Sequence, residues 1–243
     1  MNVIDPETTL ADVVTNHPDL ARELERRGLD YCCHGGRSLT EACRAAGLDP
    51  DAVATELGTA ADPTGPEPWA GLGPAELVDH LESVHHRYLH SELPRLGALV
   101  DKVVEVHGAR HPELAEVGRR FAELRAGLEP HLMKEELALF PAIRHLAQAT
   151  TRPVLPFGSI ANPISMMRGD HDRDGEVLAR LRVVTNDYRV PEDGCASYRA
   201  LYDGLARLEA DTHLHIHKEN NVLFPAVLRL EDELRVGEHE DSP

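Results

Sequence analysis

Apolar residues recur at alternating intervals of four and three positions along four long stretches of the chain. This spacing is typical of helices that bury one face in a bundle. The two clearest stripes read Val117, Phe121, Leu124, Leu128, His131, Glu135, Ala138 and Leu201, Leu205, Leu208, Thr212, His215, Glu219, Val222. The pattern predicts long helices over about residues 74–106, 112–148, 164–184 and 196–235. We therefore expect an all-α fold with a four-helix bundle.

Both stripes are apolar until they reach a His/Glu pair, and the sequence around the two pairs is repeated. Each copy reads H-x-x-K-E-x-x-x-L-F-P-A, starting at His131 and at His215. Residues four positions apart share a helix face, so each histidine and its glutamate (Glu135, Glu219) can point at one place. A solvated ion pair would explain one such pair. Two pairs in phase with an apolar core instead predict metal ligands, because a buried carboxylate is costly unless it is paired or bound.

Two further histidines are expected to complete the ligand set. His171 is the only histidine of the third helix and follows the stripe Met167, His171, Asp174, Leu178, Leu181. In the first helix we favour His86 over His85, because it continues the stripe Glu82, His86, Leu89, Leu93, Leu96, Val100, Val103. Zinc sites usually have fewer ligands, and calcium and magnesium prefer oxygen alone. Two non-haem iron ions with a small oxygen bridge are therefore predicted, with copper and manganese left open.

Prolines fall inside three of the predicted long helices. Pro141 and Pro225 follow the two His/Glu pairs, and Pro94 lies within the first long helix. Proline removes a backbone donor and its ring clashes with the preceding turn. We expect a kink at Pro94 and bends at the other two positions.

A smaller helical unit precedes the bundle. Short helices are expected over 10–16 and 18–27, then from the capping box Ser38-Leu-Thr-Glu41 to Ala46, and from Asp49-Pro50 onward. A stretch rich in glycine and proline follows and is typical of a linker. The predicted organisation is a helical domain at 1–57, a linker at 58–73, the bundle at 74–235 and an acidic tail at 236–243.

Charge and cysteine usage narrow the functional classes. The 243-residue chain has a net charge of −17 and only 4% aromatic residues, which disfavours binding to nucleic acid. No apolar run is long enough for a membrane span, and the N-terminus does not resemble a signal peptide. Cys32, Cys33, Cys43 and Cys195 do not form a disulfide framework, so a reducing cytoplasm is expected.

The adjacent cysteines lie in the loop Tyr31-Cys-Cys-His-Gly-Gly36, ahead of the helix that starts at Ser38. A thiol in such a place can have a lowered pKa and be reactive. Alternatively, Cys32 and Cys33 are small buried apolar residues. Residue chemistry alone gives these two interpretations equal weight.

Together these motifs resemble the iron–sulfur cluster repair di-iron proteins, or Repair of Iron Centres family. The resemblance covers nearly the whole chain. It rests on Asp30-Tyr-Cys-Cys-His-Gly-Gly36, in which His34 is an insertion, on His85-His86, on Met133-Lys-Glu-Glu136 with Leu139-Phe-Pro141, on Asp170-His-Asp172, and on Glu219-Asn-Asn-Val-Leu-Phe-Pro225. It implies a hemerythrin-like bundle with a di-iron centre held by His86, His131, Glu135, His171, His215 and Glu219.

The resemblance also implies a cytoplasmic role in restoring iron–sulfur clusters after oxidative or nitrosative damage, with the damaged proteins as clients. Cys32 and Cys33 are candidates for a redox function or an iron relay. One alternative is a di-iron redox enzyme that binds or reduces nitric oxide, and another is a hemerythrin-like oxygen binder or sensor. The sequence leaves open the clients, the reductant, a homodimer, whether the cysteines contact iron, and whether nitric oxide is turned over.

Overall fold

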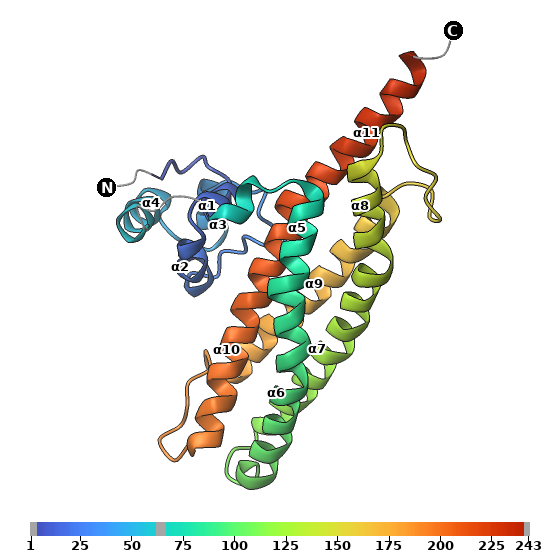
Figure 1. The fold of residues 1–243 in the computed structure, drawn as a ribbon. Coiled ribbons are helices and arrows are strands. Elements are labelled where there is room, and N and C mark those ends of the chain that lie inside the picture. Colours follow the sequence, from blue (N-terminus) through green and yellow to red (C-terminus); the bar gives the residue numbers. More distant parts are fainter. Residues whose placement is uncertain (1–3, 62–66, 241–243) are drawn as a thin grey trace. The chain divides into compact units, whose positions relative to one another are not determined.

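The computed structural model describes residues 4–61 and 67–240. These residues form helices joined by loops, with two isolated β-bridges and no extended strand (Figure 1). The all-α prediction is confirmed. Two compact units are present: Met1–Val78 with Arg144–Pro153 and His213–Pro243, and Asp79–Ile143 with Val154–Thr212. No helix in the described part of the chain is long and apolar enough to cross a membrane.

The N-terminal helices occur near their predicted limits, and two of them begin at predicted capping residues. They are α1 (Leu10–Asn16), η1 (Pro18–Leu20), α2 (Ala21–Arg26), α3 (Leu39–Ala45) and α4 (Pro50–Ala60). Ser38 and Glu41 form the expected capping box, and the Asp49 side chain caps α4, in which Pro50 takes the first position. Gly28 and Gly47 follow α2 and α3 with φ of 68° and 72°, a conformation that favours glycine.

The long helical stretches all occur near their predicted limits. They are α5 (Pro74–Leu81), η3 (Glu82–His86), α6 (Arg87–His107), α7 (Leu114–Lys134), η4 (Glu135–Leu139), α8 (Phe140–Gln148), α9 (Ala161–Val184), α10 (Ala196–His217), η5 (Lys218–Leu223) and α11 (Phe224–Glu240). Helices α6, α7, α9 and α10 run alongside one another (Figure 1). Within the second unit, their stripes meet in one apolar core that includes residues from Leu89 to Leu208. The predicted four-helix bundle is thereby confirmed.

Three π-helical turns interrupt these helices at the metal motifs, which the sequence analysis did not predict. They are η3, η4 and η5. A π turn inserts one extra residue, so the buried face moves by one position beyond it. Accordingly Leu139 and Leu223 are buried where the predicted stripes placed Ala138 and Val222.

The prolines lie within continuous helical stretches. Pro94 lies inside α6, which continues through it to His107. Pro141 and Pro225 each come two residues after a π turn ends. A widened turn gives the proline ring room against the carbonyl four residues earlier. The π turn before Pro141 and the π turn before Pro225 therefore accommodate the proline rings within continuous helical stretches.

The predicted linker overlaps ordered elements at both ends. Helix α4 reaches Ala60, and η2 (Pro68–Gly71) holds the fully buried Trp69, while residues 62–66 lie outside the described part. In the first unit the Trp69 ring lies 6.0 Å from the His217 ring. The core of the N-terminal helices also includes Ile216. These helices therefore pack on a segment that the expected boundaries assign to the bundle. Of the predicted acidic tail, residues 241–243 lie outside the described part.

Candidate metal centre

A buried cluster of three histidines surrounds Glu135 in the second unit. The Glu135 side chain is fully buried, and its Oε2 lies 3.4 Å from His86 Nε2 and 3.3 Å from His131 Nε2. His171 Nε2 lies 3.3 Å from His131 Nε2. The four residues come from η3, α7, η4 and α9, so separate helices aim their side chains at one place. His131 and Glu135 thus lie side by side, four positions apart in the sequence.

The spacing of these donor atoms fits a shared cation. Ligand bonds of roughly 2.1 Å at right angles place neighbouring donors about 3 Å apart. Two imidazoles that face each other through Nε2, as His131 and His171 do, repel unless a proton or a cation lies between them. A carboxylate buried among imidazoles likewise needs a positive partner. The chemistry of the donor set therefore fits a metal with nitrogen and oxygen ligands.

The second His/Glu pair has the same arrangement in the first unit. His215 Nε2 lies 3.1 Å from Glu219 Oε1, and both side chains are buried. As at Glu135, the glutamate lies within or at the start of a π turn and the histidine lies in the preceding helix. Four of the six predicted ligands thus come together in the second unit, and the other two come together in the first.

The structure distinguishes His86 from His85, although both are buried. His86 turns its Nε2 to Glu135, whereas His85 Nδ1 bonds Asp211 Oδ1 at 2.9 Å. The sequence analysis favoured His86 over His85 and did not identify the acidic partner of His85. The hydrogen bond to Asp211 gives the buried His85 ring a polar partner.

Glu136 holds the far side of the His86 ring, a role that the sequence analysis did not assign. Its Oε1 accepts hydrogen bonds from His86 Nδ1 at 2.9 Å and from His90 Nε2 at 2.8 Å. Burial acts to raise the Glu136 pKa, but the bonds from His90 and His86 outweigh it and lower the pKa. Metal-binding histidines commonly donate their second N–H to a carboxylate in this way. The four-residue interval between His86 and His90, which places both rings on one helix face, was the sequence signal that could have indicated a shared partner.

Asp170 has a similar place beside His131. The neighbouring His131 ring, followed by Lys134, holds the Asp170 pKa far below its usual range. His131 Nδ1 lies 3.7 Å from Asp170 Oδ2, and Lys134 pairs with the same oxygen. A charged carboxylate is thus kept behind a second histidine of the cluster.

The adjacent cysteines are arranged around Asp30. Asp30 Oδ1 accepts hydrogen bonds from Cys32 N at 3.0 Å, Cys33 N at 2.9 Å and Cys32 Sγ at 3.2 Å, and the two sulfur atoms are 3.8 Å apart. The hydrogen bond to Cys33, then burial, raises the Cys32 pKa well above its usual value. The lowered pKa suggested by the loop position is therefore not found at Cys32. Cys33 is partly exposed, and all four cysteines are free.

The cysteine loop is hydrogen-bonded to η5, the π turn that carries Glu219. Asn221 Nδ2 donates to the carbonyl oxygens of Tyr31 and Cys32 at 3.2 and 3.1 Å, and Asn220 Nδ2 reaches Cys32 O at 3.3 Å. A Cβ on Gly35 would overlap the Tyr31 carbonyl oxygen, so this path requires glycine. The sequence analysis assigned no role to the asparagines, because their partners lie near the other end of the chain.

His217 adds a buried polar contact at the same place. Its ring nitrogens bond Thr15 Oγ1 and Asn221 Nδ2, each at 3.2 Å, and its ring lies 5.6 Å from that of Tyr31. Burial lowers the His217 pKa to about 4, so the ring is neutral near pH 7. The sequence analysis assigned no role to His217. Its role is to pack the N-terminal helices onto the segment beside Glu219.

Comparison with known proteins matches both halves of the chain. Residues 77–227 match the hemerythrin HHE cation binding domain, and residues 6–61 match a domain of unknown function, DUF542. The chain is 29% identical to the iron-sulfur cluster repair protein ScdA of Staphylococcus haemolyticus (strain JCSC1435), over 91% of this chain and 98% of the relative. It is 32% identical to the iron-sulfur cluster repair proteins YtfE of Escherichia coli O1:K1 / APEC and of Enterobacter sp. (strain 638), over 90% of this chain and 96% of each.

Proposed function

The chain belongs to the iron–sulfur cluster repair proteins with a hemerythrin HHE cation binding domain, and we propose that it repairs clusters damaged by oxidative or nitrosative stress by supplying iron. Its clients are then damaged iron–sulfur proteins. The observation that carries the proposal is the buried set of three histidines around Glu135. A reducing cytoplasm suits this role and agrees with four free thiols.

We further propose that the six predicted ligands would hold two non-haem iron ions with a small oxygen bridge. Support comes from the repeated motif and from the same i,i+4 geometry in both copies. Two iron ions would supply a redox-active store of metal. The chain's own contribution is to orient each histidine: Glu136 fixes His86, and Asp170 lies behind His131.

Cys32 and Cys33 are proposed to relay iron or electrons between this centre and a damaged cluster. The proposal is supported by the hydrogen bonds from Asn220 and Asn221, which place the cysteine loop against the turn that carries Glu219. In this conformation the raised Cys32 pKa keeps its thiol protonated. A relay role therefore requires an event that removes that proton, such as metal binding.

The test uses adjacent histidines as a matched pair. His86→Ala should lower the iron content and abolish reactivation of an oxidatively damaged iron–sulfur dehydratase, assayed anaerobically with a chelator that removes free iron. His85→Ala, an equally buried change one residue away, should retain iron and activity. Equal activity of the His86→Ala and parent proteins would contradict the proposal. Turnover of nitric oxide without reactivation would instead support the alternative redox enzyme.

A further inference from the structure

The cysteine loop contains a second group of metal-ligating side chains, separate from the histidine cluster. Asp30, Cys32 and Cys33 each offer one ligand atom, and these atoms lie within 4.8 Å of one another. We propose that they bind a single divalent transition-metal ion in transit, iron(II) in the working protein. This proposal rests on the proposed function, which gives the site its cargo.

Two of the distances between these ligand atoms are close to those of a tetrahedral site. Metal–sulfur bonds of about 2.3 Å at the tetrahedral angle separate two sulfur atoms by about 3.8 Å, and a metal–oxygen bond of about 2.0 Å separates sulfur from oxygen by about 3.5 Å. The observed Sγ–Sγ distance for Cys32 and Cys33 is 3.8 Å, and Cys32 Sγ lies 3.2 Å from Asp30 Oδ1. The loop can therefore accept a cation with small side-chain adjustments.

Metal binding would exchange protons for the ion. The Cys32 S–H group donates a hydrogen bond to Asp30 Oδ1, so the thiol proton lies close to the place of the cation. Binding of M²⁺ to two thiols forms two metal–sulfur bonds, breaks two S–H bonds and releases two protons to water, with no change of oxidation state. Two thiolates with one carboxylate select zinc, iron(II) or cobalt(II) over calcium and magnesium.

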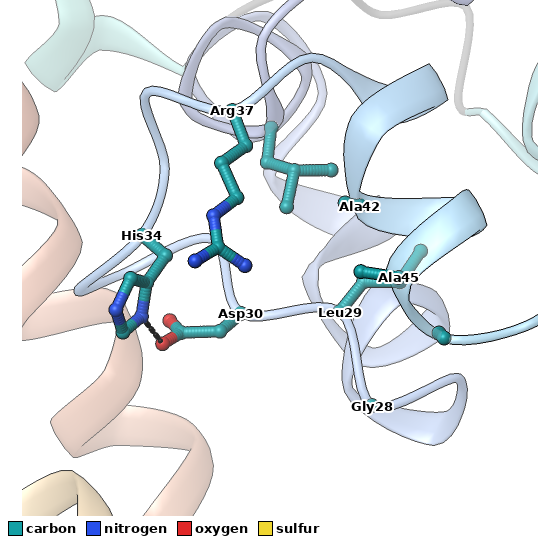
Figure 2. Close-up of a pocket in the computed structure, with 9 residues that line it drawn as sticks. Gly28, Leu29, Asp30, His34, Arg37, Ala42 and Ala45 are labelled. Atoms are coloured by element: carbon teal, nitrogen blue, oxygen red, sulfur yellow. Dashed lines mark hydrogen bonds and ion pairs between the residues drawn. The ribbon is translucent and has the colours of Figure 1, made fainter.

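His34 and a pocket complete the site on its outer side. His34 Nδ1 lies 2.6 Å from Asp30 Oδ2, so the inserted histidine fixes the carboxylate, as Figure 2 shows. Asp30 and His34 line a pocket of about 190 Å³, with Arg37 across from them and apolar walls formed by residues such as Leu29 and Ala42 (Figure 2). The pocket gives solvent access to the carboxylate. A site with three protein ligands keeps a fourth position open, which suits transfer better than storage.

The backbone of the proposed site is hydrogen-bonded to the turn that carries Glu219. The Cys32 carbonyl accepts hydrogen bonds from Asn220 and Asn221, the two residues that follow Glu219 in η5. All of these residues belong to the first unit. An ion leaving the Glu219 end would therefore find thiolate ligands on a segment that is bonded to the same turn.

The site is tested by anaerobic titration of the iron-loaded full chain with Co²⁺, followed through thiolate-to-cobalt charge-transfer absorption. One Co²⁺ per chain is expected to give this signal. Cys32→Ser/Cys33→Ser should abolish it. Asp30→Asn, which keeps an acceptor for the backbone N–H groups, should weaken binding by at least roughly tenfold. Cys43→Ser/Cys195→Ser, the matched control at the other two free thiols, should leave it unchanged.

Two results would overturn the site: an unchanged titration in the Cys32/Cys33 variant, or equal Co²⁺ affinity of the Asp30→Asn and parent proteins. Failure of the proposed function has a different signature. A parent protein that shows the cobalt signal but cannot reactivate a damaged dehydratase would overturn the repair proposal and the transit role while leaving the metal site. A parent that reactivates clusters without the cobalt signal would overturn the site alone.

Discussion

Removal of the Glu136 carboxylate should weaken iron binding, although Glu136 is not itself a predicted ligand. In Glu136→Ala the buried His86 loses its 2.9 Å hydrogen bond and with it the contact that fixes the ring. A hydrogen bond to a charged group contributes about 1.5–3 kcal/mol. The bond from His90 adds little, because the His90 side chain is 55% exposed. The expected loss is therefore roughly 10- to 100-fold in iron affinity, the range found for outer partners of metal ligands.

The measurement is an anaerobic competition between the protein and a chelator for ferrous iron. Glu129→Ala is the matched control, because Glu129 is a carboxylate of α7, the helix that leads into the turn of Glu136, and it pairs with exposed Arg125 on the surface. Its iron affinity should equal that of the parent. If Glu136→Ala also retains parental affinity while the circular dichroism spectrum is unchanged, the assignment of Glu136 as the residue that orients His86 is wrong.

Two further predictions concern the attachment of the N-terminal helices. Asn221→Ala removes the donor to the Tyr31 and Cys32 carbonyls, so the free energy of unfolding should fall by about 1–3 kcal/mol. The thiols of Cys32 and Cys33 should also react faster with a thiol reagent. An unchanged thiol reaction rate would contradict this attachment. Ile216→Ala opens a cavity in the N-terminal core and should lower the free energy of unfolding in urea by about 2–5 kcal/mol, whereas a loss below about 1 kcal/mol would contradict its place in that core.

The sequence by itself determined the features that depend on local spacing. The capping box at Ser38, the limits of α1 and the stripe that ends in His131 and Glu135 all follow from side chains within one or two turns of each other. The i,i+4 geometry likewise fixes the partner of His215 before any tertiary contact is known. For this reason the helices and the pairing within each copy of the motif could be predicted.

The tertiary structure decided the features that depend on partners far along the chain. Periodicity could not show that Glu136 would hold His86, or that Asn221 would bond a carbonyl at Cys32. Nor could it show the π turns, which shift the buried face from Ala138 to Leu139. Burial, which also raises the Cys32 pKa beside the contacts with Cys33 and Asp30, is likewise decided by the packed chain. Burial and distant hydrogen bonds are properties of the packed chain, and local sequence does not encode them.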